Sequence, residues 1–255
     1  MRKALVAGNW KMNKVSSELA GFFSDFGRFS NYDKSLVDVL IAPSSVMLKE
    51  ALNLAGPLEV EVASQTCHEA EKGAFTGELS LPMLADIGLS WSLVGHSERR
   101  QYYGETNETV ANKASACLER GFKPIICIGE TLEERESGMM ASALTRQLSA
   151  VFEKLPALGP VVFAYEPVWA IGTGKTASDE DADRAHAFIR SQIAEGYGAD
   201  QAGQTRILYG GSVKPSNVSG LVSREHIDGA LVGGASLQAR DFADIVNEAS
   251  KVAQV

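Results

Sequence analysis

Cysteine is scarce in this sequence, with three such residues in a chain of 255. Cys67, Cys117 and Cys127 are far apart, and no two of them have the C-x-x-C spacing of redox and zinc motifs. A disulfide framework and a zinc site are therefore not expected, and the composition fits a protein of the reducing cytoplasm.

Long apolar runs and an excess of positive charge are also missing. No stretch is apolar over the length that a membrane span requires, and the N-terminal stretch MRKALVAGNW lacks the longer apolar core of a signal peptide. The net charge of −8 argues against nucleic acid or an anionic membrane as the main partner, since either favours a basic face. A small anionic substrate is compatible with it, because salt screens exposed charges beyond about 8 Å and a few local groups then dominate.

No linker or low-complexity segment interrupts the chain, so residues 1–255 are expected to form one domain. What recurs is a short run rich in Val, Ile, Leu and Ala. Most runs are almost continuously apolar, as expected of parallel strands covered by helices, whereas LEVEVAS alternates Glu and Val. The eight runs lie at 3–9, 36–42, 58–64, 91–96, 123–129, 161–167, 205–211 and 228–234.

Helix-like patterns lie between most of these runs. After the sixth run, Ser178 is a suitable N-cap, and the apolar residues Ala182, Ala185, Ile189 and Ile193 share one helix face. Eight strand–helix units in a chain of this size predict an α/β fold, a single (β/α)8 barrel of eight parallel strands with outer helices. A doubly wound open sheet is the alternative, and the pattern alone does not exclude it.

Polar residues and glycines collect at the C-terminal ends of the apolar runs. In a barrel these ends meet at one mouth, where barrel enzymes carry out their chemistry, whereas an open sheet would spread them along an edge. The residues are Asn9, Lys11, Gln65, His96, Glu130, Glu166, 210–212, Gly233 and Gly234.

The stretch IGTGKT (171–176) looks like the end of a phosphate-binding loop. The P-loop pattern G-x-x-x-x-G-K-[ST] would need a glycine where Trp169 stands, so that motif is absent. The dinucleotide spacing G-x-G-x-x-A is present, but PVWAI separates it from the preceding strand. Small residues between stiffer flanks favour a hinged lid over residues 167–177 instead of a surface connection.

Paired glycines follow the last two runs, in YGGSV (209–213) and LVGGAS (231–236). Glycines let backbone N–H groups approach an anion closely, and a following helix N-terminus adds a favourable dipole. One pair alone would usually be a tight turn. Two pairs after the last two strands of a barrel, with the Ser212 hydroxyl in one of them, favour a phosphate site.

His96, Glu166 and Lys11 are the candidates for acid–base chemistry. His96 precedes SERR, which starts a helix, and a helix N-terminus favours a neutral ring that can still donate a hydrogen bond. Glu166 stands among aromatic residues, where exclusion of water would strengthen it as a base. With Lys11 as a cation and no cluster at metal-ligand spacing, the set suits proton abstraction next to a carbonyl in a small phosphorylated compound.

Six motifs make the sequence similar to the triosephosphate isomerase family along essentially its whole length. The resemblance implies interconversion of dihydroxyacetone phosphate and D-glyceraldehyde 3-phosphate through an enediol(ate), without a metal or an organic cofactor. The motifs are GNWKMN (8–13), GAFTGE (73–78), VGHSERR (94–100), AYEPVWAIGTGKTA (164–177), LYGGSVKP (208–215) and DGALVGGASL (228–237).

The resemblance also implies a role for each site residue. Glu166 moves the proton between two substrate carbons, neutral His96 polarises the carbonyl, and Lys11 supplies positive charge. Asn9 helps to position the substrate, and Glu98 supports this network. The phosphate is expected to bind backbone N–H groups at Gly172, Ser212, Gly233 and Gly234.

A homodimer is the assembly that the resemblance implies. The segment 65–79 lacks helical or strand periodicity, and long loops of this kind in compact domains tend to be functional. In the family this loop docks into a second subunit, where Thr76 is expected to approach the Asn9 and Lys11 of the other chain. Phe75 at its tip fits such an interface.

Two functions from other classes compete with isomerisation. A non-catalytic phosphosugar-binding barrel would keep the glycine loops and lose a catalytic residue, so the presence of Lys11, His96 and Glu166 speaks against it. A nucleotide-dependent enzyme rests only on the GTGKT stretch.

Overall fold

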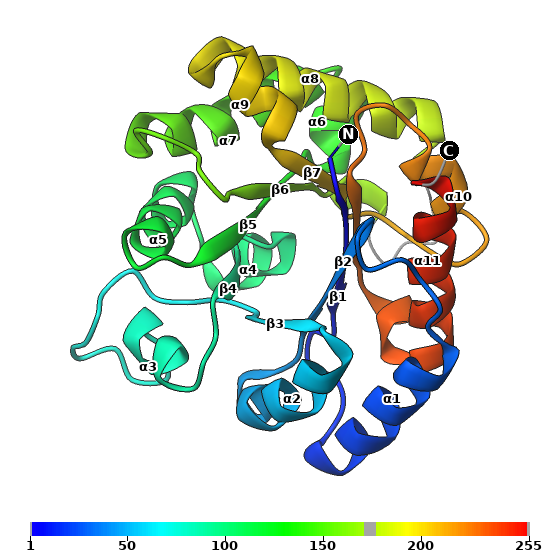
Figure 1. The fold of residues 1–255 in the computed structure, drawn as a ribbon. Helices are drawn as coiled ribbons and strands as arrows, with labels where there is room; N and C mark the ends of the chain where they lie inside the picture. The colour runs from blue at the N-terminus through cyan, green and yellow to red at the C-terminus, as the bar shows by residue number, and fades with distance from the viewer. Residues whose placement is uncertain (1, 171–176, 254–255) are drawn as a thin grey trace.

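The structure, a computed structural model, describes residues 2–170 and 177–253. Eight parallel strands form a closed barrel in chain order, and the last strand pairs with the first (Figure 1). Because a closed barrel leaves no sheet edge, the expected (β/α)8 fold is confirmed and the open sheet is excluded. The strands are β1 (Ala4–Asn9), β2 (Val37–Ala42), β3 (Glu61–Ser64), β4 (Trp91–Val94), β5 (Lys123–Ile128), β6 (Val162–Tyr165), β7 (Arg206–Tyr209) and β8 (Gly229–Val232).

Apolar side chains fill both the inside of the barrel and the layer outside it. Along β1, Leu5 and Ala7 belong to one buried cluster and Val6 to the other, as the alternation of side chains along a strand requires. Both faces of the strands are thus buried, which explains why most of the runs are almost continuously apolar. Cys127 is fully buried in the inner cluster.

The third strand is shorter than its sequence pattern suggested. Pro57 occupies the first turn of the short 3-10 helix η2 (Gly56–Leu58), and Glu59 follows it in the left-handed region at φ 59°. The strand begins only at Glu61, so the first residues of LEVEVAS belong to a turn. A left-handed residue cannot continue an extended ladder, which is why the alternation was misleading here.

Helices surround the barrel on its outer face (Figure 1). Four of the described elements are short 3-10 turns, η1 (Ser45–Met47), η2, η3 (Val168–Ala170) and η4 (Gly234–Leu237). Within the described ranges, no helix is long and apolar enough to cross a membrane. The α-helices are α1 (Ser16–Phe29), α2 (Leu48–Ala55), α3 (Leu81–Asp86), α4 (Ser97–Tyr103), α5 (Asn107–Glu119), α6 (Leu132–Glu136), α7 (Met140–Lys154), α8 (Asp179–Tyr197), α9 (Ala199–Gln204), α10 (Val218–Val222) and α11 (Ala239–Val252).

Helix α8 forms as its sequence predicted. The Ser178 side chain accepts a hydrogen bond from the Asp181 N–H and so satisfies one of the unpaired donors of the first turn. The four residues of the expected stripe, Ala182 to Ile193, are fully buried against the barrel. The helix therefore begins at Asp179, close after the segment 171–176.

The segment 65–79 connects β3 to α3 without a helix or strand of its own, as expected. A backbone bridge joins His68 to Ser80 at its base, and the His68 and Phe75 rings lie 4.1 Å apart between centroids. Phe75 remains 47% exposed, so part of an aromatic ring faces solvent at the loop.

Candidate active site

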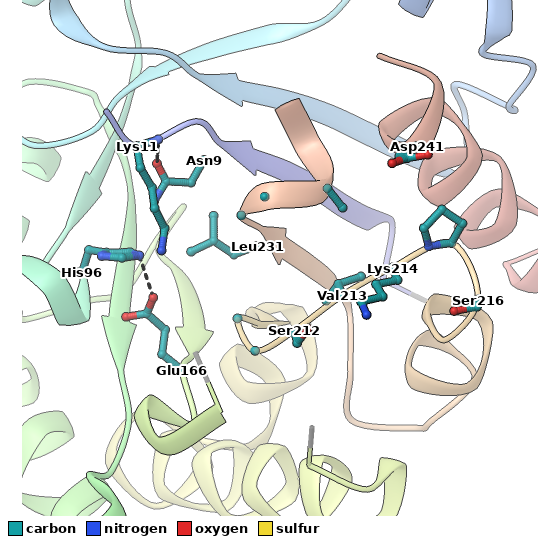
Figure 2. A pocket seen from close by; sticks show the side chains of 16 residues that line it. Asn9, Lys11, His96, Glu166, Ser212, Val213, Lys214, Ser216, Leu231 and Asp241 are labelled. Atoms are coloured by element: carbon teal, nitrogen blue, oxygen red, sulfur yellow. Dashed lines mark hydrogen bonds and ion pairs between the residues drawn. The ribbon is translucent and has the colours of Figure 1, made fainter. Parts of the chain in front are cut away.

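The C-terminal ends of five strands surround a cavity of about 660 Å³ (Figure 2). β1 supplies Asn9 and Lys11, β4 leads to His96, and β6 leads to Glu166. The residues after β7 and β8 close the other side with glycines, so the expected meeting of strand ends at one mouth is confirmed for this set. The glycine side is lined by Gly210, Gly211, Ser212, Gly233 and Gly234.

His96 and Glu166 form a buried pair in this cavity. The Nε2 atom of His96 lies 2.9 Å from Oε1 of Glu166. The other carboxylate oxygen, Oε2, accepts the backbone N–H of Ser97 at 2.8 Å. Ser97 is the first residue of α4, where N–H groups point away from the helix and favour an anion.

His96 is the N-cap of α4, which fixes the ring tautomer. Its Nδ1 accepts the backbone N–H of Glu98 at 3.2 Å, so the ring proton belongs on Nε2, facing Glu166. Burial alone would lower the pKa of His96, but the neighbouring Glu166 carboxylate outweighs burial and raises it. The contact at Nδ1 therefore supports the neutral ring expected from the sequence. The contact with Glu166 instead favours the protonated ring.

Glu166 is fully buried, and burial opposes its charge. The charge and hydrogen bond of His96, together with the Ser97 N–H, nevertheless lower its pKa below the ordinary value. These same contacts hold the carboxylate in its present place. A Glu166 that left them would lose the groups that stabilise its charged form and would become a stronger base.

Lys11 reaches the cavity from a left-handed backbone conformation, with φ 52°. Its N–H donates to the Asn9 Oδ1 at 3.0 Å, and its carbonyl accepts from the Gln65 side chain at 2.8 Å. The ammonium Nζ lies 2.6 Å from Oε1 of Glu98. Asn9 and Glu98 therefore contact Lys11 directly, as partners of its backbone and its charge respectively.

The glycine loops face the cavity on the side opposite His96 (Figure 2). A Cβ at Gly234 would meet nothing within 4 Å, and one at Gly233 would meet only the Lys11 side chain, so space is open in front of this backbone. Ser212 lines the same wall. Gly172, the remaining residue expected at the phosphate, lies outside the described residues together with the rest of 171–176.

Two of the strand-end residues, Gln65 and Glu130, do not line this cavity, and Glu130 faces the interior of the protein. It is fully buried, and its Oε1 accepts from the Tyr165 hydroxyl and the Trp169 Nε1, each at 2.9 Å. Trp169, before the segment 171–176, therefore shares the Glu130 acceptor with Tyr165 at the end of β6. After that segment, the Ala177 backbone is hydrogen-bonded to Tyr209 at the end of β7.

Sequence reasoning missed three contributors to the site. Lys214 and Asp241 line the cavity; Lys214 lies in the motif LYGGSVKP without having been singled out, and nothing in the local sequence marked Asp241. The Ser97 N–H had a signal, because SERR was expected to begin a helix and helix N-termini bind carboxylates. In the described part of the chain, no group of three or more His, Cys, Asp or Glu side chains could hold a metal ion.

A second cavity of about 300 Å³ adjoins the first. Lys11 and Glu98 form its inner wall, and Met12 and Tyr103 lie at its rim, where they are 95% and 69% exposed. Thr76 is exposed on the segment 65–79 of the same chain and does not line either cavity.

Comparison with known proteins agrees with this geometry. The family model described as "Triosephosphate isomerase" matches residues 4–249. Proteins named triosephosphate isomerase include one from Chlorobium phaeobacteroides, 49% identical over 98% of this chain and 100% of its own. One from Citrifermentans bemidjiense is 50% identical over 96% and 98%, and one from Bacteroides fragilis is 45% identical over 97% and 99%. The chain is therefore an intramolecular isomerase that belongs to the triosephosphate isomerase family.

Proposed function

We propose that this chain interconverts dihydroxyacetone phosphate and D-glyceraldehyde 3-phosphate by proton transfer through an enediol(ate). The observation that carries the proposal is the His96–Glu166 pair, at 2.9 Å, in one cavity with Lys11 and two glycine loops. A base, a hydrogen-bond donor, a cation and an anion-binding wall are the groups that this reaction needs.

The substrate phosphate binds the glycine wall in this proposal. Backbone N–H groups of Ser212, Gly233 and Gly234 donate to its oxygens, with Gly172 as a further expected donor. The three-carbon chain then extends across the cavity toward His96 and Glu166. Seating the phosphate at a fixed wall places the reacting carbons next to the base, which removes the entropic cost of orienting them during reaction.

Glu166 acts as the base. In the unliganded site it is bound to His96 and Ser97, so it must release both to reach a substrate carbon. Release removes the contacts that lower its pKa, while the apolar surroundings remain. The carboxylate therefore gains basicity at the moment when it approaches the proton that it abstracts.

His96 and Lys11 stabilise the charge that appears on the substrate oxygens. Once Glu166 has left, Nε2–H of neutral His96 is free to donate to the carbonyl oxygen and to pass protons between the two oxygens. Lys11 places its ammonium beside the same position, held by Glu98. The cation lowers the energy of the enediolate more than that of the uncharged carbonyl.

The homodimer is part of this proposal. Met12 and Tyr103, which line the second cavity, are 95% and 69% exposed, and Val46, next in the chain to the lining residue Ser45, is 86% exposed. This apolar surface fits the exposed Phe75 of another copy. In such a dimer, Thr76 of one chain would enter the second cavity of the other chain, close to Lys11.

A coupled assay with Glu166→Asp tests the mechanism. The shorter side chain keeps its charge but withdraws the carboxylate by about one methylene, so we expect kcat to fall by at least about 100-fold with little change in KM. Glu133→Asp, at an exposed position on α6, is the matched control and should leave kcat unchanged. Near-normal kcat in Glu166→Asp would refute Glu166 as the base. Phosphate-compound binding without turnover in the unmodified protein would favour the binding-module alternative.

A further inference from the structure

Two of the three cysteines meet in the folded chain, away from the active-site cavity. Cys67 follows β3 in the segment 65–79, and Cys117 lies in the last turn of α5. Their sulfur atoms are 3.6 Å apart, and both thiols are reduced and fully buried. A disulfide needs a sulfur–sulfur distance of about 2.05 Å, so closing the pair requires a movement of about 1.5 Å.

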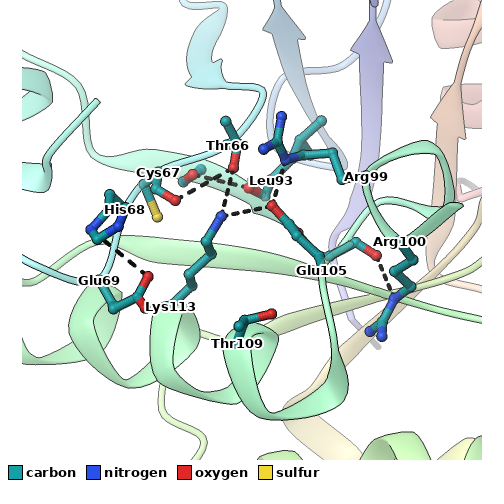
Figure 3. Close-up of polar contacts among 12 residues, drawn as sticks. Thr66, Cys67, His68, Glu69, Leu93, Arg99, Arg100, Glu105, Thr109 and Lys113 are labelled. Atoms are coloured by element: carbon teal, nitrogen blue, oxygen red, sulfur yellow. Dashed lines mark hydrogen bonds and ion pairs between the residues drawn. The ribbon is translucent and has the colours of Figure 1, made fainter. Parts of the chain in front are cut away.

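Helix α5 presents a charged group and a thiol to the same short stretch of loop. Lys113 and Cys117 are four residues apart and so lie on one helix face. Figure 3 shows the Lys113 side chain in contact with Thr66 and Glu105. Its Nζ lies 3.2 Å from the Thr66 hydroxyl and 2.6 Å from Oε1 of Glu105. The face of α5 that carries Cys117 is thus held against residues 66 and 67 by a buried polar network.

The two thiols are not equivalent. The hydrogen bond between the two sulfurs lowers the pKa of the Cys67 thiol despite its burial, and the Ser92 hydroxyl and the Lys113 ammonium act in the same direction. The same contact and burial raise the pKa of Cys117. Either sulfur can donate the hydrogen bond between them, and the Ser92 hydroxyl favours negative charge on Cys67.

We propose that Cys67 and Cys117 are an oxidation site, at which a peroxide converts the two thiols into a reversible disulfide. The Cys67 thiolate attacks one peroxide oxygen, the O–O bond breaks, and the leaving hydroxide takes a proton, which gives a sulfenic acid and water. The Cys117 sulfur then attacks the Cys67 sulfur, the S–O bond breaks, and a second water leaves with the Cys117 proton. Two thiols and one hydrogen peroxide give one disulfide and two waters.

Both sulfurs are fully buried, and neither lines the two cavities described above, so peroxide reaches the pair when the packing around it opens locally. Cys127 is the internal reference, because it is buried inside the barrel and burial raises its pKa well above the ordinary value.

The disulfide would act on the active site through Gln65, a step that rests on the proposed function. The Gln65 side chain donates to the carbonyls of Lys11 and Ala42, at 2.8 and 3.0 Å. Cys67 is two residues away, so drawing it toward α5 pulls on this pair of hydrogen bonds. Lys11 is already in a left-handed conformation and depends on its neighbours to stay there. Oxidation should therefore reduce turnover reversibly.

The test uses the fully reduced protein and hydrogen peroxide. After treatment, alkylation under denaturing conditions and peptide mass spectrometry should show one free thiol, Cys127, and one cross-linked peptide pair containing Cys67 and Cys117. Three alkylated thiols, or a sulfinic acid at Cys67 beside a free Cys117, would overturn the proposal. The chemical readout needs no variant, so it stands even where a core substitution fails to fold.

Turnover measurements separate this inference from the proposed function. We expect kcat to fall several-fold on oxidation and to return with a dithiol reductant, and we expect Cys117→Ala to abolish the reversible loss while Cys127→Ala retains it. A disulfide that forms without any change in turnover would overturn the link to Lys11. If the reduced protein shows no isomerisation at all, the proposed function fails, and the mass-spectrometric result still decides the oxidation site.

Discussion

Among single residues, His186 is a titratable side chain that burial in the fold keeps in its neutral form. It lies in α8, fully buried between the rings of Tyr165 and Tyr209, with centroid distances of 5.5 and 6.2 Å. Its Nδ1 lies 2.7 Å from the Ala182 carbonyl, so Nδ1 carries the ring proton and donates it. Burial lowers its pKa from 6.5 to about 4.

This lowered pKa predicts a loss of stability in mild acid. Between pH 6.5 and 4 the unfolded chain binds a proton at His186 that the folded chain does not, so stability falls as pH falls through this window. The full effect is about 3 kcal/mol for a shift of this size. Urea unfolding at pH 7 and pH 4 should show a smaller acid-induced loss in His186→Gln than in the unmodified protein. Equal losses of stability between pH 7 and pH 4 in the two proteins would contradict the lowered pKa of His186.

At the scale of elements, the contact between β5 and β6 sets the position of the base. Ile128 pairs with Tyr165, and the Glu166 N–H continues the ladder by donating to the Ile128 carbonyl at 2.7 Å. Gly129 comes next, and a Cβ there would lie 1.7 Å from the Glu166 carbonyl oxygen. The glycine is therefore required by close approach of two backbones, not by its own conformation.

Gly129→Ala should damage stability and catalysis together. The backbone of Glu166 cannot yield as a flexible side chain would, so we expect destabilisation of about 3 kcal/mol. The displaced carboxylate should lower kcat by about 100-fold. Gly203→Ala in α9 is the matched control, because its Cβ would meet nothing within 4 Å and alanine favours a helix. Thermal unfolding and the coupled assay measure both effects, and a Gly129→Ala protein with normal kcat would contradict this account.

At the scale of the whole molecule, the chain is acidic, with a net charge of −8, yet large apolar side chains are exposed near the second cavity. Val46 and Met12 are among its most exposed apolar side chains. Leu132 and Met139, 42% and 46% exposed, lie on the α6–α7 side of the barrel, away from that cavity. The proposed dimer buries Met12 and Val46 and leaves Leu132 and Met139 exposed to solvent.

Val46→Glu should therefore weaken association of the proposed dimer. A carboxylate buried in an apolar interface without a partner is costly, so we expect the dissociation constant to rise by at least about 10-fold, equivalent to about 1.4 kcal/mol. Met139→Glu makes the same change outside the interface and should leave association intact. Sedimentation equilibrium compares the two variants. Equal behaviour, or a monomer in the unmodified protein, would remove the dimer from the proposal.

Much of the fold was readable from local sequence because its signals act over a few residues. The apolar runs, the Ser178 cap and the apolar stripe of α8 each depend on neighbours along the chain, and all of them are found in the structure. Where a local turn competed, as at Pro57 and Glu59, the strand pattern overestimated the strand. The strand-end positions of Lys11, His96 and Glu166 likewise followed from the order of the runs.

The sequence by itself determined which residue types stand at the strand ends and that eight strand–helix units repeat. Only the tertiary structure decided which of them meet: His96 contacts Glu166, Glu130 turns away to Tyr165 and Trp169, and Cys67 contacts Cys117. The physical reason is that periodicity and capping are local, whereas these contacts join separate strands and helices. Their distances are set by barrel closure and by packing between elements, which no short stretch of sequence contains.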